Sequence, residues 1–116
     1  MWYKIGDDMY DKSQLMRGTL EGCILKILSD STTYGYEIAA RLKEYGFEDI
    51  REGTIYPLLV RLEKKKIISS EFRPSPLGPS RKYYSLTKEG AQYLEEFIDH
   101  WKQVAGSINA IFGLEE

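Results

Sequence analysis

Apolar residues recur at helical spacing in the centre of the chain. Positions 55, 58, 59 and 62 are Ile or Leu at i, i+3, i+4 and i+7, so they share one face of a helix. We therefore predict an amphipathic helix over residues 53–66. Its buried face holds Ile55, Leu58, Leu59 and Leu62, and its opposite face holds Tyr56, Val60, Arg61 and Lys64.

A period of two replaces this spacing directly after the helix. In residues 68–73, Ile68 and Phe72 alternate with polar side chains, and residues 81–86 are rich in Tyr, which favours strands. The segment 74–80 between them contains three prolines and a glycine, so we expect it to end both strands and form the tip of a β-hairpin.

Two shorter apolar stripes precede the central helix. A first helix is predicted over residues 13–29, followed by a turn over residues 30–33. Thr33 is expected to cap a second helix over residues 34–45, and Gly46 is expected to end it. The residues predicted to face the core are Leu20, Ile24, Ile27 and Leu28 of the first helix, and Ile38, Ala39 and Leu42 of the second.

Gly18 and Gly22 are unusual within the first helix, because a helical glycine costs about 1 kcal/mol relative to alanine. They stand four residues apart and so share one face. Either another segment approaches that face closely, or open space is needed beside it. For Gly18 the alternative is a position near a frayed helix start.

The last apolar stripe is the longest. Thr87 is a good N-cap for a helix that extends to Phe112, about 37 Å at 1.5 Å per residue. This stripe is wider and longer than one small domain can cover, so we expect it to form a two-fold symmetric homodimer. The stripe consists of Leu94, Ile98, Trp101, Ala105, Ile108 and Phe112, with Phe97, Val104 and Ile111 in a second row.

This order of elements predicts a mainly α fold with a small β-hairpin: a winged helix-turn-helix with a long C-terminal dimerisation helix. We expect an N-terminal arm over residues 1–12, a winged helix domain over residues 13–87 and the dimerisation helix over residues 88–116. The arm is expected either to be only partly ordered or to pack on a partner subunit.

The distribution of charge favours a nucleic-acid partner although the whole chain is acidic, with a net charge of −2. Residues 51–86 carry eight Lys or Arg and three acids, a local balance of +5, whereas residues 1–50 and 87–116 are negative. Attraction to phosphate is screened beyond about 10 Å at 0.1 M salt. The local positive charge, and not the net charge of the whole chain, therefore determines whether this segment attracts nucleic acid.

Little in the composition indicates catalysis. One His and one Cys give no zinc spacing, and neither a glycine-rich phosphate loop nor a nucleophile elbow is present. We therefore expect no enzyme activity, no metal and no cofactor. No apolar run approaches the roughly 20 residues that span a bilayer, so no membrane partner is expected. With a single Cys and no signal-peptide pattern, a cytoplasmic location is expected.

Three motifs in order resemble those of the PadR family of transcriptional regulators. Residues 35–38 read Gly-Tyr-Glu-Ile, residues 53–57 read Gly-Thr-Ile-Tyr-Pro, and residues 82–90 read Lys-Tyr-Tyr-Ser-Leu-Thr-Lys-Glu-Gly. They match the family's second helix, the start of its recognition helix and the exit from its wing. The resemblance spans about residues 15–112 and implies a dimeric repressor that binds a pseudo-palindromic operator in double-stranded DNA.

The predicted helix and hairpin supply candidate DNA contacts. Side chains of the helix are expected at base edges or phosphates, and those of the wing at phosphates. For Lys64 the alternative role is compensation of the helix dipole. The candidates are Thr54, Tyr56, Arg61, Lys64, Arg81 and Lys82.

Trp101 allows two interpretations. It is either a core aromatic in the dimer interface or, as the resemblance to multidrug-sensing PadR proteins implies, one of two indoles that sandwich a planar aromatic ligand. Ala105 stands where those relatives carry an acid, so a preference for cationic ligands is not implied. The resemblance implies a ligand site of Leu15, Gly18, Gly22, Ile98, Trp101 and Ala105. A constitutive repressor without ligand and a winged helix used only for protein–protein interaction remain alternatives.

Overall fold

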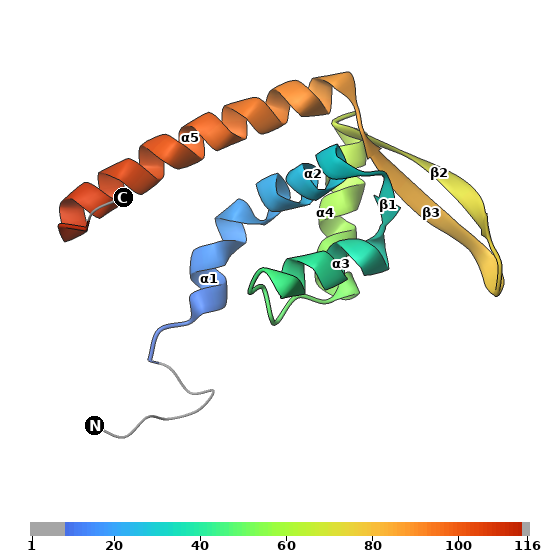
Figure 1. Cartoon of the computed structure of the whole chain (residues 1–116), viewed down its shortest axis with the longest axis horizontal. Helices are drawn as coiled ribbons and strands as arrows, with labels where there is room; N and C mark the ends of the chain where they lie inside the picture. Colours follow the sequence, from blue (N-terminus) through green and yellow to red (C-terminus); the bar gives the residue numbers. More distant parts are fainter. Residues whose placement is uncertain (1–8, 115–116) are drawn as a thin grey trace.

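The computed structural model describes residues 9–114, so most of the predicted arm lies outside the described residues. The β-hairpin of a small antiparallel sheet projects from one end of a group of helices, and a long helix crosses one side of the molecule (Figure 1). The predicted mainly α winged-helix fold is confirmed. The elements are α1 (Lys12–Met16), the 3-10 helix η1 (Arg17–Thr19), α2 (Leu20–Asp30), β1 (Thr33–Tyr34), α3 (Gly35–Glu44), α4 (Glu52–Lys64), β2 (Ile68–Ser75), β3 (Gly78–Leu86) and α5 (Lys88–Phe112).

The sheet has three strands in the order β1-β3-β2, so the prediction of a two-stranded hairpin was incomplete. The turn predicted at residues 30–33 ends in β1, where Thr33 pairs with Tyr84 of β3. Thr33 therefore does not cap the second helix. Tyr34 is the N-cap of α3, and its side chain makes no capping hydrogen bond.

The wing is longer than predicted. We expected residues 74–80 to form its tip, but β2 reaches Ser75 and β3 begins at Gly78. The register shifts between Arg73 and Ser75, and Pro74 is paired with no residue of β3. Its missing N–H therefore removes no hydrogen bond from the sheet.

The predicted first helix is broken into α1, η1 and α2. Gly18 lies in the 3-10 segment, and a Cβ added there would meet nothing within 4 Å. Gly22 is buried, and a Cβ added there would lie 2.2 Å from the Phe97 ring of α5. Close approach of another segment therefore explains Gly22, and the expectation of open space beside it is wrong.

The hydrophobic core lies where α2, α3, α4 and the base of the sheet meet. Every residue predicted to face the core in the first two helices is buried, and so are three of the four in α4. Leu58 is half-buried against the same cluster. The fully buried side chains are Ile24, Leu25, Ile38, Leu42, Ile55, Leu59, Leu62 and Ile68.

The end of α4 sets the direction of the wing. Lys66 has a positive φ of 63°, its N–H donates to the carbonyl of Glu63, and the N–H of Ile67 donates to that of Leu62. These two bonds form a Schellman motif, which normally uses glycine at the left-handed position. The motif buries Ile67 next to Leu62 and turns the chain directly into β2.

Lys66→Gly is therefore expected to stabilise the protein by about 1 kcal/mol, because a left-handed backbone strains a residue that has a Cβ. The neighbouring Lys65 has φ −80°, so Lys65→Gly is a matched control that should destabilise by a similar amount. Urea unfolding of both variants measures the difference. Stabilisation by neither or by both would contradict this description of the helix end.

The two halves of α5 have different surroundings. Thr87 caps the helix by accepting a hydrogen bond from the N–H of Gly90, as predicted. Leu94 is buried and Ile98 packs against the core, so the first members of the predicted dimer stripe are covered by their own chain. From Trp101 onward the same face continues past α2 and is exposed (Figure 1). The exposed apolar residues of this part, here called the distal face, are Trp101, Val104, Ile108, Ile111 and Phe112.

Candidate nucleic-acid interface

Two of the sequence motifs meet at the contact between α3 and α4. The hydroxyl of Tyr56 would lie 2.9 Å from a Cβ added to Gly35, so only glycine lets the ring lie against the first turn of α3. The same hydroxyl donates a hydrogen bond to the Glu52 carboxylate at 3.2 Å. Partial burial, followed by the hydrogen bond and charge of Glu52, raises the pKa of Tyr56. The hydroxyl therefore stays protonated at neutral pH and can act as a donor.

Lys82 of the wing faces α4. Its ammonium lies 3.4 Å from the Glu63 carboxylate and 5.6 Å from the centre of the Tyr84 ring. Glu63 also accepts a hydrogen bond from Ser70 of β2. These contacts hold the wing at a fixed position beside the helix, while about two-fifths of the Lys82 side chain remains exposed.

Arg81 and Arg73 are partners across the hairpin, and each stacks on a tyrosine. The Arg81 guanidinium stacks 4.5 Å from the centre of the Tyr34 ring, and Arg73 stacks 4.7 Å from that of Tyr83. The two tyrosines contact each other edge to face at 5.3 Å. Tyr84 is buried in the core and Tyr83 is half-buried, in keeping with the alternation of neighbouring side chains across a strand.

The wing, the start of α3 and the start of α4 enclose one cleft of about 470 Å³, here called the wing cleft. It brings together three of the predicted DNA-binding residues, Tyr56, Arg81 and Lys82. Cations and hydroxyl donors on its walls suit a phosphate backbone. The lining residues are Tyr34, Gly35, Tyr36, Glu52, Tyr56, Ser80, Arg81 and Lys82.

The other three predicted contacts lie elsewhere on α4. Arg61 is on the side that faces α2, where its guanidinium forms an ion pair with Glu21. Thr54 is exposed and lines a second cavity beside α1, away from the wing. Lys64 is exposed in the last turn of the helix. The helical pattern placed Arg61 and Lys64 on the face opposite the apolar stripe, and both are exposed, but it did not indicate that Arg61 pairs with α2.

Sequence reasoning missed the roles of Gly35, Tyr34 and Arg73 near this cleft. The sequence pattern places Gly35 and Tyr34 at the start of a helix and indicates only a positive charge at Arg73. Pairing between β1 and β3 creates the aromatic support beneath Arg81, and this pairing joins segments about fifty residues apart. The one available signal was the Gly-Tyr motif at residues 35 and 36.

The residues predicted to bind a ligand do not form one cavity within the chain. Gly22 is filled by Phe97, and Ile98 packs on the core. Leu15 and Trp101 are exposed, with half of the Trp101 side-chain surface accessible. Gly18 is exposed and Ala105 is half-buried, and neither is among the residues that line the two cavities described here.

An amphipathic helix beside a cationic two-stranded wing, both built on a helical core, defines the winged helix class of DNA-binding proteins. The chain belongs to the PadR-like family of transcriptional regulators, whose family model matches residues 24–96. It is therefore a DNA-binding transcriptional regulator of that family, which is not a family of enzymes.

Similar proteins cover most of the chain. The PadR-like transcriptional regulator of Bacillus cereus is 46% identical, with a TM-score of 0.79 over 89% of this chain and 100% of its own. A Streptococcus transcriptional regulator is also 46% identical, with a TM-score of 0.76 over 84% of this chain and 96% of its own. A Lysinibacillus sphaericus protein described only as uncharacterized protein X is 35% identical over 107 residues, which are 90% of this chain and 98% of that protein.

Two further observations bound the chemistry. Within residues 9–114 no group of three or more His, Cys, Asp or Glu side chains is arranged to hold a metal ion. None of the helices described is long and apolar enough to cross a membrane.

Proposed function

We propose that this regulator is a homodimeric repressor that binds a pseudo-palindromic operator through α4 and the wing. The single observation that carries the proposal is the wing cleft, where Tyr56, Arg81 and Lys82 converge between the two elements. In this arrangement the exposed face of α4 enters the major groove and the wing lies along the adjacent backbone. Acting at chromosomal DNA, the protein works in the cytoplasm.

Each predicted contact receives a role in this proposal. Arg81 and Lys82 neutralise phosphates, and the Tyr56 hydroxyl donates to a phosphate or base edge once it leaves Glu52. Thr54 and Lys64 contact the backbone at the two ends of α4. Arg61 reaches DNA only if it leaves Glu21, so its contribution depends on the competition between that carboxylate and a phosphate.

The distal face of α5 supports the homodimer. Five apolar side chains there are exposed in the single chain, and Phe112 retains 68% of its accessible surface. Pairing with a second copy about a two-fold axis covers this face and gives the symmetry that a pseudo-palindrome needs. In this proposal residues 13–87 bind DNA, residues 88–116 form the dimer, and residues 1–12 are an arm.

Selection from a pool of random DNA duplexes tests the proposed function. It should enrich a sequence with two related half-sites whose centres are about one or two helical turns apart. Recovery of asymmetric sequences, or of no preferred sequence, would count against a dimeric operator-binding repressor.

The proposal also includes release of the repressor from its operator by a planar aromatic ligand. Trp101 is half exposed on the distal face, where two copies could stack on a flat guest in the dimer. Ile98 and Ala105 lie one helical turn from it, and in this proposal Leu15 and Gly18 complete the site. Ligand-free repression, with Trp101 as interface packing alone, is the alternative. Ligand-induced release and ligand-free repression both place Trp101 at the subunit interface, so only a measurement of ligand binding distinguishes these two hypotheses.

In a Trp2→Phe background, a flat aromatic dye is expected to quench the remaining indole fluorescence with saturation. Trp101→Ala in that background removes the last tryptophan, so dye binding by this variant is followed by the fluorescence of the dye itself. Dye binding should fall at least about tenfold, and operator binding should stay within a few-fold. Persistent dye binding in the double variant would exclude the ligand site. Loss of the dimer would instead assign Trp101 to packing.

Exposed apolar residues on the wing support a second candidate function, a protein-binding module. Phe72 is 70% exposed and Leu77 at the turn is 98% exposed. Replacing both by Ser should leave operator affinity within about threefold if the wing contacts only phosphates. A regulator that retains operator binding but loses repression in cells would show that the wing also binds a protein.

A further inference from the structure

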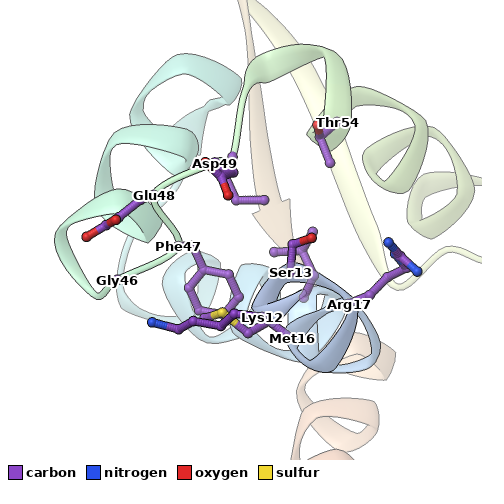
Figure 2. A pocket seen from close by; sticks show the side chains of 11 residues that line it. Lys12, Ser13, Met16, Arg17, Gly46, Phe47, Glu48, Asp49 and Thr54 are labelled. Carbon is purple, nitrogen blue, oxygen red and sulfur yellow. The ribbon is translucent and has the colours of Figure 1, made fainter. Parts of the chain in front are cut away.

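A second cavity of about 270 Å³ lies on the other side of α4 from the wing cleft. It opens between α1 and η1 on one wall and the α3–α4 connection with the first turns of α4 on the other (Figure 2). We call it the turn pocket. Drug-sized ligands occupy pockets of about 300–1,000 Å³, so this volume suits a smaller molecule. The lining residues are Lys12, Ser13, Met16, Arg17, Leu20, Gly46, Phe47, Glu48, Asp49, Ile50 and Thr54.

The turn pocket has an apolar floor. Phe47 lies next to Met16 in Figure 2, and with Leu20 and Ile50 these side chains come from three separate segments. All four are at least half-buried, and three of them pack on or belong to the core cluster. A floor of this kind binds an aromatic or branched aliphatic group.

Charged side chains of both signs line the cavity around this floor. Lys12 and Arg17 come from the α1–η1 wall, whereas Glu48 and Asp49 come from the connection between α3 and α4. Among residues 9–114, the ion pairs of the structure use other side chains. Hydrogen bonds from Ser13, together with the Arg17 charge, lower the pKa of the nearby Asp11 carboxyl. The side chain of Thr54 lies on the same wall as Asp49 (Figure 2).

We propose that the turn pocket binds a small apolar zwitterion, of which an aromatic α-amino acid is the simplest example. Its carboxylate pairs with Arg17, whose long side chain turns toward the cavity, and its ammonium pairs with Asp49, while Lys12 and Glu48 add charge of the matching sign at the rim. Its side chain rests on Phe47 and Met16. Opposite charges on one small ligand satisfy both walls together, which an anion or a cation alone does not.

Occupancy will also change DNA binding, a consequence that rests on the proposed function. The pocket connects α1 to the segment between α3 and α4 and to Thr54, so a ligand fixes the turn that positions the recognition helix. The segment is held at its start by the N–H of Phe47 donating to Leu42 and at its centre by that of Ile50 donating to Phe47. A ligand shifts operator affinity by the ratio of its affinities for the DNA-bound and free geometries.

Three probes of equal apolar size test the site on the full chain without DNA: L-phenylalanine, phenethylamine and 3-phenylpropionate. Backbone amide NMR should show saturable shifts at Asp49 and Thr54, with L-phenylalanine binding about tenfold more tightly than either analogue. The Glu48→Gln/Asp49→Asn variant should lose the preference over 3-phenylpropionate, and Arg17→Gln the preference over phenethylamine. Asp99→Asn and Arg73→Gln change exposed charges far from the pocket and should retain both preferences.

Absence of saturable shifts up to the solubility limit of the probes would overturn the site. Equal binding of the three probes, or unchanged preferences in the pocket variants, would overturn the zwitterion assignment. Operator affinity is measured separately. If L-phenylalanine binds but leaves operator affinity unchanged, the coupling to DNA is wrong while the site stands.

Discussion

Ile108→Asp should convert the dimer into monomers at micromolar concentration, raising the dimer dissociation constant at least about 100-fold. Ile108 lies on the distal face of α5 together with Trp101 and Val104. In a two-fold interface each substitution occurs twice, and a carboxylate buried without a partner costs several kcal/mol. Operator affinity should fall in parallel, because only a dimer occupies both half-sites together.

The matched control is Gln103→Asp, which introduces the same charge on the opposite side of α5. Residue 103 is exposed. It stands five residues before Ile108, so the two side chains point about 140° apart around the helix and residue 103 lies away from the distal face. Sedimentation velocity should find Gln103→Asp dimeric. Because the distal part of α5 is exposed in the single chain, circular dichroism should show both variants folded. A dimeric Ile108→Asp protein would exclude this face as the interface.

The second large effect concerns the wing. Removing both cations, as in Arg81→Ala/Lys82→Ala, should reduce operator affinity by about 100-fold at 0.1 M salt. Each dimer would lose four phosphate contacts, and the slope of log K against log salt should become less steep by about 3 to 4 units. Fluorescence anisotropy at several salt concentrations measures both quantities.

Lys102→Ala provides the control, because it removes an exposed cation of α5 away from the wing cleft. Its affinity and salt slope should match those of the unmodified protein. Arg61→Ala should also weaken binding, and Glu21→Gln should strengthen it if releasing Arg61 makes that side chain available to phosphate. A double wing variant with an unchanged salt slope would show that Arg81 and Lys82 do not contact DNA.

The helices could be predicted because their signals are local. The apolar spacing of α4 and the Thr87 cap of α5 each lie within one segment, and both elements were found where the pattern placed them. The order of helix and hairpin predicted the winged-helix arrangement, and the three motifs added the family. Two-residue β1 has no such signal, since it exists only through pairing with β3.

Other features depended on contacts between distant segments. Three prolines predicted a long loop at the wing tip, but the bulge near Pro74 lets the strands continue. The helical pattern placed Arg61 on an exposed face, but its pairing with Glu21 requires α2 and α4 to be packed. Likewise, Gly22 suggested either close contact or open space, and only the position of Phe97 decides between them.

The central claim is that two copies of this chain bind one symmetric operator through α4 and the wing. The most direct measurement titrates the protein into a selected operator, its isolated half-site and a scrambled duplex at one fixed salt concentration. We predict two chains per operator and an affinity at least about 1,000-fold higher than for the scrambled duplex, with much weaker binding to the half-site. Equal affinity for the three duplexes, or one chain per operator, would contradict the claim.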